Sequence, residues 1–142
     1  MPTRRVYLPV SPGALAALVS TGELGPAPLS AYAVTNALGR PGLTVDEEEL
    51  EHEAWAAAAE AASDLSVGGS RRRVIASADV DSANVLEGAG SDPASVTLGA
   101  KVPLRRIVSF HVDEHAGGRE VTDLLWYDVT ELPDVARLVD TD

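Results

Sequence analysis

The sequence predicts a single α+β domain with a mostly antiparallel sheet of roughly four to five strands and helices packed mainly on one face. A length of 142 residues fits one domain. The expected order is one strand, three helices, four strands and a final helix, which is not the strict alternation of a doubly wound parallel sheet. The short connections between the last strands require antiparallel pairing.

The first strand is expected at 5–10, where short β-branched and aromatic residues are grouped. Ser11 then supplies an N-cap and Pro12 the first position of a helix that runs to about Ser20. Gly22 is placed to end this helix in a left-handed conformation. Residues 23–28 contain Gly and two Pro and are expected to form a loop.

Two more helices are expected before the next strand. Ser30 is a possible N-cap for a helix to Leu38, because Gly39 and Pro41 follow at the usual offsets for a helix end. Thr44 and Glu47 have capping-box spacing at the start of a helix that reaches about Ser63. Its alanine-rich stripe would allow a close approach to a sheet.

The second half of the sequence predicts strands and a short closing helix. The expected strands and helix are 73–80, 96–102 weakened by Gly99, 105–112, 121–129 and a helix from Pro133, with a loop at 84–93. In 105–112, alternation places Ile107, Ser109 and His111 on one face.

Charge and composition exclude several classes of function. The formal net charge is −11, with 22 acidic residues against 11 Lys and Arg. Such a surface repels phosphate backbones and anionic lipids, so we expect neither a nucleic-acid nor a membrane partner. The absence of cysteine removes disulfides, thiol nucleophiles and cysteine-ligated metals, and it fits a reducing cytoplasm.

Arginines precede three of the expected strands. They are Arg4-Arg5, Arg71-Arg72-Arg73 and Arg105-Arg106, seven of the eleven Lys and Arg residues. One interpretation is an anion site formed by Arg5, Arg72, Arg73, Arg105 and Arg106, since guanidinium groups match phosphate oxygens. The other interpretation, which we favour, is that the arginines are dispersed around the molecule. Each group would then mark the end of a strand and balance the charge of neighbouring acidic residues.

The sequence offers little support for a metal or a reaction centre. His111 and Asp113 share a strand face and are the strongest candidates for metal ligands, but a third ligand would have to come from elsewhere. No Gly-x-Ser-x-Gly motif and no cysteine supply a nucleophile. We therefore assign no catalytic residue, no metal and no cofactor, and we favour a protein that is not an enzyme.

Three runs of residues resemble known proteins. They are Arg5 to Pro9 (RVYLP) with Gly22 to Thr35 (GELGPAPLSAYAVT), and Leu124 to Leu132 (LLWYDVTEL). With these runs the chain resembles a small uncharacterised family of actinobacterial proteins. The resemblance implies an actinobacterial cytoplasmic protein and supplies no activity and no site residue.

A second similarity is to the ADP-ribosyltransferase-like fold. It involves Val80-Asp81 and the segment from Val102 to Ile107 between expected strands. That fold implies a basic residue on the first strand and a late glutamate, positions that Arg5 and Glu120 would fill. The Ser-Thr-Ser motif and the paired tyrosines of those enzymes are not visible.

We predict a non-enzymatic protein-binding or accessory module. Its contact would be the apolar strand face near Trp126 and Tyr127 or the acidic helix near Glu48 and Glu53, with a protein partner or a second copy. The alternative is a small enzyme or ligand binder that holds a nucleotide or another phosphorylated molecule with its arginines.

Overall fold

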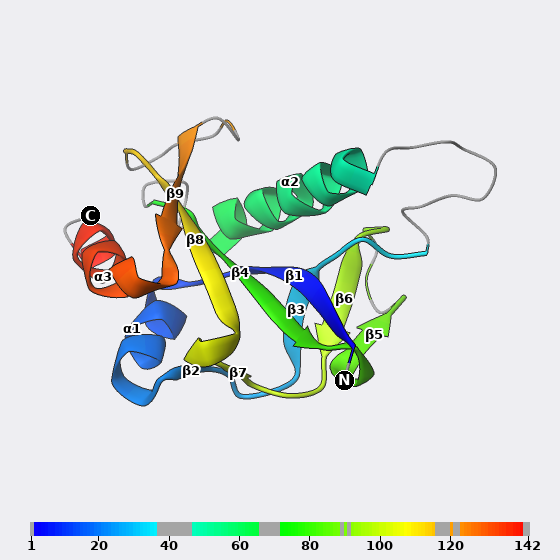
Figure 1. Ribbon diagram of the computed structural model, residues 1–142. Coiled ribbons are helices and arrows are strands. Elements are labelled where there is room, and N and C mark those ends of the chain that lie inside the picture. The colour runs from blue at the N-terminus through cyan, green and yellow to red at the C-terminus, as the bar shows by residue number, and fades with distance from the viewer. Residues whose placement is uncertain are drawn as a thin grey trace.

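One antiparallel sheet organises the molecule (Figure 1). The computed structural model describes residues 2–36, 47–65, 72–88, 90, 92–115, 120 and 123–140. In this part of the chain the sheet has seven strands in the order β5-β6-β3-β1-β4-β8-β9, where about four to five were expected. The strands are β1 (Thr3–Pro9), β3 (Leu29–Tyr32), β4 (Val74–Asp81), β5 (Val85–Glu87), β6 (Ser95–Leu98), β8 (Ile107–Asp113) and β9 (Leu124–Asp128). A separate pair joins β2 (Glu23–Leu24) to β7 (Val102–Pro103).

The α+β class is as predicted, but the helices lie on both faces of the sheet. α2 (Glu47–Leu65) covers one face, where its buried alanines pack with Tyr7 and Ile75. α1 (Pro12–Thr21) and α3 (Leu132–Asp140) lie on the other face, on the side of Val6 and Phe110 (Figure 1). The central strands β1 and β4 carry buried side chains on both sides, so each face needs its own cover.

The caps predicted for the first helix are confirmed. Ser11 accepts a hydrogen bond from the Ala14 amide at 3.1 Å, and Pro12 occupies the first turn. Gly22 has φ of 80° and donates its N–H to the Leu18 carbonyl at 2.8 Å. These two caps determine where α1 begins after β1 and where it ends before β2 along the chain.

α2 is also confirmed, with its buried positions at Ala54, Ala58, Ala59 and Ala62. Alanine adds only a methyl group, so the helix backbone can lie close to the sheet. Three glutamates occupy the first turn, where they favour the positive end of the helix dipole. The predicted capping residue Thr44 lies outside the described residues.

Three short strands replace expected loops and a helix. The predicted helix at 30–38 is wrong over its described part, since β3 pairs with β1 and β6 there. The buried residues Ala31 and Ala33 follow the period of a strand. β5 lies in the expected loop 84–93 and β2 in the expected loop 23–28. In each case pairing with distant residues stabilises a segment whose local sequence favours no strand.

Two irregularities change the predicted strands in the last third of the chain. β6 and β7 belong to different sheets, so 96–102 is not one strand. The register between β4 and β8 shifts at Ser77/Ala78, which places Ile107 in the same core cluster as Phe110 and Val112. The predicted face shared by Ile107, Ser109 and His111 is therefore wrong. Val108, opposite the shift, is exposed.

Candidate functional site

Most of the described basic side chains are held by bonds within the protein. Six of the eight have such partners, and these are Arg4 with Glu87, Arg5 with Asp79, Arg72 with the Leu138 and Glu114 carbonyls, Arg73 with Asp113, Lys101 with Glu23 and Arg137 with Asp134. Arg5, Arg72 and Arg73 were predicted anion ligands. Arg5 lies toward the opposite end of β4 from Arg72 and Arg73, and each of the three guanidinium groups bonds within the protein.

Arg73 and Asp113 form a buried ion pair at the junction of β4 and β8. The two residues are 3% and 1% exposed. Arg73 Nη2 donates to Asp113 Oδ1 at 2.8 Å and Nε donates to Oδ2 at 3.0 Å. The Arg73 amide donates to the same Oδ2 at 2.6 Å, and Nη2 also reaches the Glu120 carbonyl at 2.6 Å. This pair is part of the architecture and is closed to solvent.

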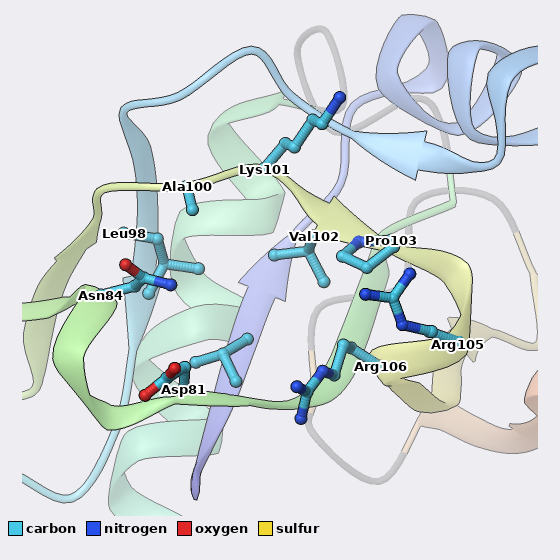
Figure 2. Close-up of a pocket in the computed structure, with 10 residues that line it drawn as sticks. Asp81, Asn84, Leu98, Ala100, Lys101, Val102, Pro103, Arg105 and Arg106 are labelled. Carbon is cyan, nitrogen blue, oxygen red and sulfur yellow. The ribbon is translucent and has the colours of Figure 1, made fainter. Parts of the chain in front are cut away.

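Arg105 and Arg106 make no hydrogen bond or ion pair with any described residue. They lie on the 3₁₀ turn Leu104–Arg106 just before β8, not on the strand itself. Both line a small open cavity, the polar hollow, of about 180 Å³ (Figure 2). The hollow is lined by Val80, Asp81, Asn84, Leu98, Ala100, Lys101, Val102, Pro103, Arg105 and Arg106.

Opposite the two arginines, the hollow carries polar groups from β4 and the following turn. Figure 2 shows Asp81 and Asn84 on one side, Arg105 and Arg106 with Pro103 on the other, and Val102 between them. The Lys101 ammonium points away, toward Glu23, to which it donates at 3.1 Å. Arg105 and Arg106 thus supply the cationic groups of this hollow.

His111 and Asp113, the candidate metal ligands, both interact with other side chains of the protein. Both Asp113 oxygens accept hydrogen bonds from Arg73. His111 Nε2 lies 3.2 Å from Ser77 Oγ, and its ring centroid is 5.4 Å from that of Trp55. Burial lowers the pKa of His111 below 6.5. No group of three or more His, Asp and Glu side chains able to hold a metal occurs among the described residues.

The pair considered for an ADP-ribosyltransferase-like site is widely separated. Arg5 is paired with Asp79 in β4, whereas the Glu120 carbonyl accepts from Arg73, just before β4. Six residues of strand separate these two positions, a span of roughly 20 Å. Arg5 and Glu120 therefore lie toward opposite ends of β4 and share no site.

The predicted partner-binding aromatic residues lie on β9, at one edge of the sheet. Trp126 is 62% exposed and Leu125 is 41% exposed, while Tyr127 is half-buried against the core. Trp126 pairs with His111, which contacts Trp55 of α2, so Trp126 projects on the α2 face. Leu125, the next residue, projects on the α3 face. Apolar side chains are thus exposed on both sides of the edge.

The backbone of β9 has groups directed to the open edge. The Glu114 amide donates to the Asp123 carbonyl at 2.9 Å. The directions of the backbone N–H and C=O groups alternate along an antiparallel strand. The N–H and C=O groups of Leu124 and Trp126 therefore point away from β8. No backbone hydrogen bond from another described segment reaches these two residues.

The region around β9 is acidic. Residues 113–134 contain seven Asp and Glu residues and one Arg; six of the seven remain outside the buried Arg73–Asp113 pair. The other predicted contact residues, Glu48 and Glu53, are exposed on α2, which covers the sheet face toward which Trp126 projects. A partner at this edge would therefore meet a negative field.

These features define the class of the protein. It is an α+β protein with an acidic, open sheet edge at β9 and a polar hollow lined by Arg105 and Arg106. The chain belongs to a family of unknown function, DUF6912, whose model matches residues 4–122. β9 and α3, with the Leu124 to Leu132 run, follow the matched residues. No curated protein and no solved structure matches the chain significantly. Among the described residues, no helix is both long and apolar enough to cross a membrane.

The sequence did not predict that Asp81 and Asn84 line the same hollow as Arg105 and Arg106. They are brought there because the chain returns from β6 through Gly99, whose amide donates to the Asn84 carbonyl at 2.9 Å. This contact lies within 96–102, which the sequence predicted as a strand weakened by Gly99. A break in the pattern at Gly99 was the only signal for it.

Proposed function

We propose that this protein is a non-enzymatic binding module that takes an extended, basic segment of a partner protein against the open edge of β9. The observation that carries the proposal is the exposure of Trp126 and Leu125 on the two sides of an edge strand. An added strand would pair with the outward groups of Leu124 and Trp126 and bury both apolar side chains.

The acidic surroundings favour a basic partner over a second copy. Two copies that met through β9 would each bring a chain of net charge −11 and seven acidic residues between 113 and 134. Like charges so close together would oppose the pairing at low ionic strength. Lys and Arg side chains on the incoming segment would instead be attracted to the carboxylates.

A cytoplasmic location belongs to this proposal. It rests on the complete absence of cysteine in 142 residues, which suits a reducing compartment. The actinobacterial origin remains a prediction from the resemblance of the N-terminal and C-terminal runs.

Site-specific photo-crosslinking in the native host tests the proposal. A photoreactive phenylalanine derivative would replace Trp126 in one variant and Leu86 in a matched control, since Leu86 is 59% exposed on the opposite edge strand β5. We expect one crosslinked protein from position 126, joined through an extended segment rich in Lys and Arg, and none of it from position 86. Identical products from both positions, or a crosslink to a second copy of this chain, would contradict the proposal.

A further inference from the structure

The polar hollow is a second place where the molecule has unused binding capacity. Arg105 and Arg106 are the two described basic residues without a partner, although 22 acidic residues are present in the chain. Each guanidinium carries five N–H donors in a planar fork that matches the oxygens of phosphate. They are consecutive residues on one turn and both line the hollow, so the hollow carries two cationic groups.

The opposite side of the hollow has an acceptor and an amide that are also unused. Asp81 Oδ1 accepts from the Ala83 amide at 3.1 Å, and no described residue donates to Oδ2. The Asn84 carboxamide has no hydrogen-bond partner among the described residues. Asp81 also forms no ion pair with Arg105 or Arg106, although all three line the same cavity. A ligand that satisfies both sides must carry an anionic group and a hydrogen-bond donor.

Backbone bonds hold these groups in place. The Gly99 amide binds the Asn84 carbonyl at 2.9 Å, and the Leu104 amide binds the Gly22 carbonyl at 2.9 Å. The turn that carries the arginines is thereby fixed to the end of α1, and the turn that carries Asn84 is fixed to the end of β6. The backbone of these turns therefore loses little conformational entropy when a ligand binds, and the ordering cost falls on the two arginine side chains.

The size of the hollow limits the ligand. Its volume of about 180 Å³ lies below the roughly 300–1,000 Å³ of pockets that enclose drug-sized molecules. A whole nucleotide would extend beyond it, whereas a phosphate on a short polyol would fit. Val102 lies between the two polar sides and Pro103 lies on the side of the arginines, and both offer an apolar surface for the C–H groups of such a molecule (Figure 2).

We propose that the polar hollow binds a small hydroxylated phosphate monoester, with Arg105 and Arg106 on the phosphate and Asp81 accepting from a hydroxyl group. The Asn84 carboxamide forms a hydrogen bond with either the phosphate or the hydroxyl group of the ligand. The carboxylate of Asp81 repels the phosphate group itself and favours a ligand whose hydroxyl donor is held apart from the phosphate by a short carbon chain. This site is separate from β9 and does not depend on the partner proposed there.

An NMR titration of the full chain tests the proposal, with glycerol 3-phosphate, inorganic phosphate and glycerol as probes at matched ionic strength. We expect glycerol 3-phosphate to cause saturable shifts in the amides of 81–84 and 98–106 and to bind about tenfold more tightly than inorganic phosphate. Glycerol alone should cause none. Shifts that fail to saturate, or equal affinity for the two phosphates, would overturn the proposal.

Variants assign the roles. Arg105→Gln and Arg106→Gln should each weaken glycerol 3-phosphate binding by about tenfold or more, whereas Arg137→Gln, which changes an exposed arginine on α3, should leave it unchanged. Asp81→Asn should remove the preference for glycerol 3-phosphate over inorganic phosphate. Binding that survives in the Arg105→Gln/Arg106→Gln double variant, with its dispersed spectrum intact, would show that these residues do not form the site.

Discussion

At the scale of single residues, the same residue type has two different uses in this molecule. Arg73 is closed inside the protein with Asp113, whereas Arg105 and Arg106 face an open hollow and bond to none of the described residues. The sequence grouped all of these as arginines preceding strands. It could not separate them, because burial and the approach of Asp113 depend on how β4 and β8 pair.

The buried pair should be far more important for stability than an exposed one. Asp113→Asn leaves the Arg73 guanidinium buried without its counter-charge, so we expect a loss of about 3–5 kcal/mol in unfolding free energy. Asp79→Asn breaks the exposed Arg5 pair and should cost less than about 1 kcal/mol. Urea denaturation of the two variants measures the difference. Equal losses would show that Arg73–Asp113 is not a buried, closed pair.

His111 should make stability depend on pH. Its pKa is lowered below 6.5 by burial in the folded protein, so the unfolded chain binds the proton more tightly. The unfolding free energy is then complete above pH 6.5 and falls as the pH drops below that value.

Urea midpoints between about pH 7.5 and 5.5 measure this dependence. His111→Gln keeps a group that can bond to Ser77 but cannot titrate, so the difference between wild type and variant should shrink toward low pH. His52 and His115 are present in both proteins, and their effects cancel in the comparison. Parallel curves for the two proteins would refute the role of His111.

At the scale of elements, the sequence predicted best where local chemistry decides the structure. α1 has its cap residues at Ser11 and Gly22, and α2 has its acidic first turn and alanine stripe. β3 and β5 were missed because short segments such as Leu29–Tyr32 become strands only through partners far along the chain. The exposure of Trp126 follows from the position of β9 at the edge, which the sequence order alone does not fix.

The packing of α2 on the sheet gives a prediction at this scale. Ala58 is fully buried between the helix and the sheet, so Ala58→Leu should destabilise the fold by about 1–3 kcal/mol through overpacking. Ala56 is half-buried and lies outside the core clusters, so Ala56→Leu should cost less. Thermal unfolding of both variants compares them. A larger effect at Ala56 would place a different face of α2 on the sheet.

At the scale of the whole molecule, helices cover both faces of the sheet, and the exposed apolar side chains of β9 lie at one of its edges. The fold class and the antiparallel pairing were predictable from the order and spacing of the elements. The division of helices between two faces was not, since it depends on alternation in β1 and β4 together with the connections between them. The polar hollow likewise gathers segments around residues 80–84 and 98–106, which the sequence did not connect.

The net charge predicts how the molecule behaves in solution. At −11, two copies repel each other over about 10 Å at moderate ionic strength, so the protein should sediment as a monomer in dilute buffer. Added salt screens this repulsion and should reveal any weak pairing through β9. A dimer that is present at low salt and dissociates on adding salt would contradict the role given to the acidic surface.

The edge of β9 can be tested most directly by NMR titration with short extended peptides of alternating Val and Lys, compared with matched peptides of alternating Val and Glu. The lysine peptides should shift the amides of Leu124 and Trp126 and the Trp126 indole, and the glutamate peptides should leave them unchanged. Shifts centred on β5, or equal shifts with both peptides, would contradict the role proposed for the β9 edge.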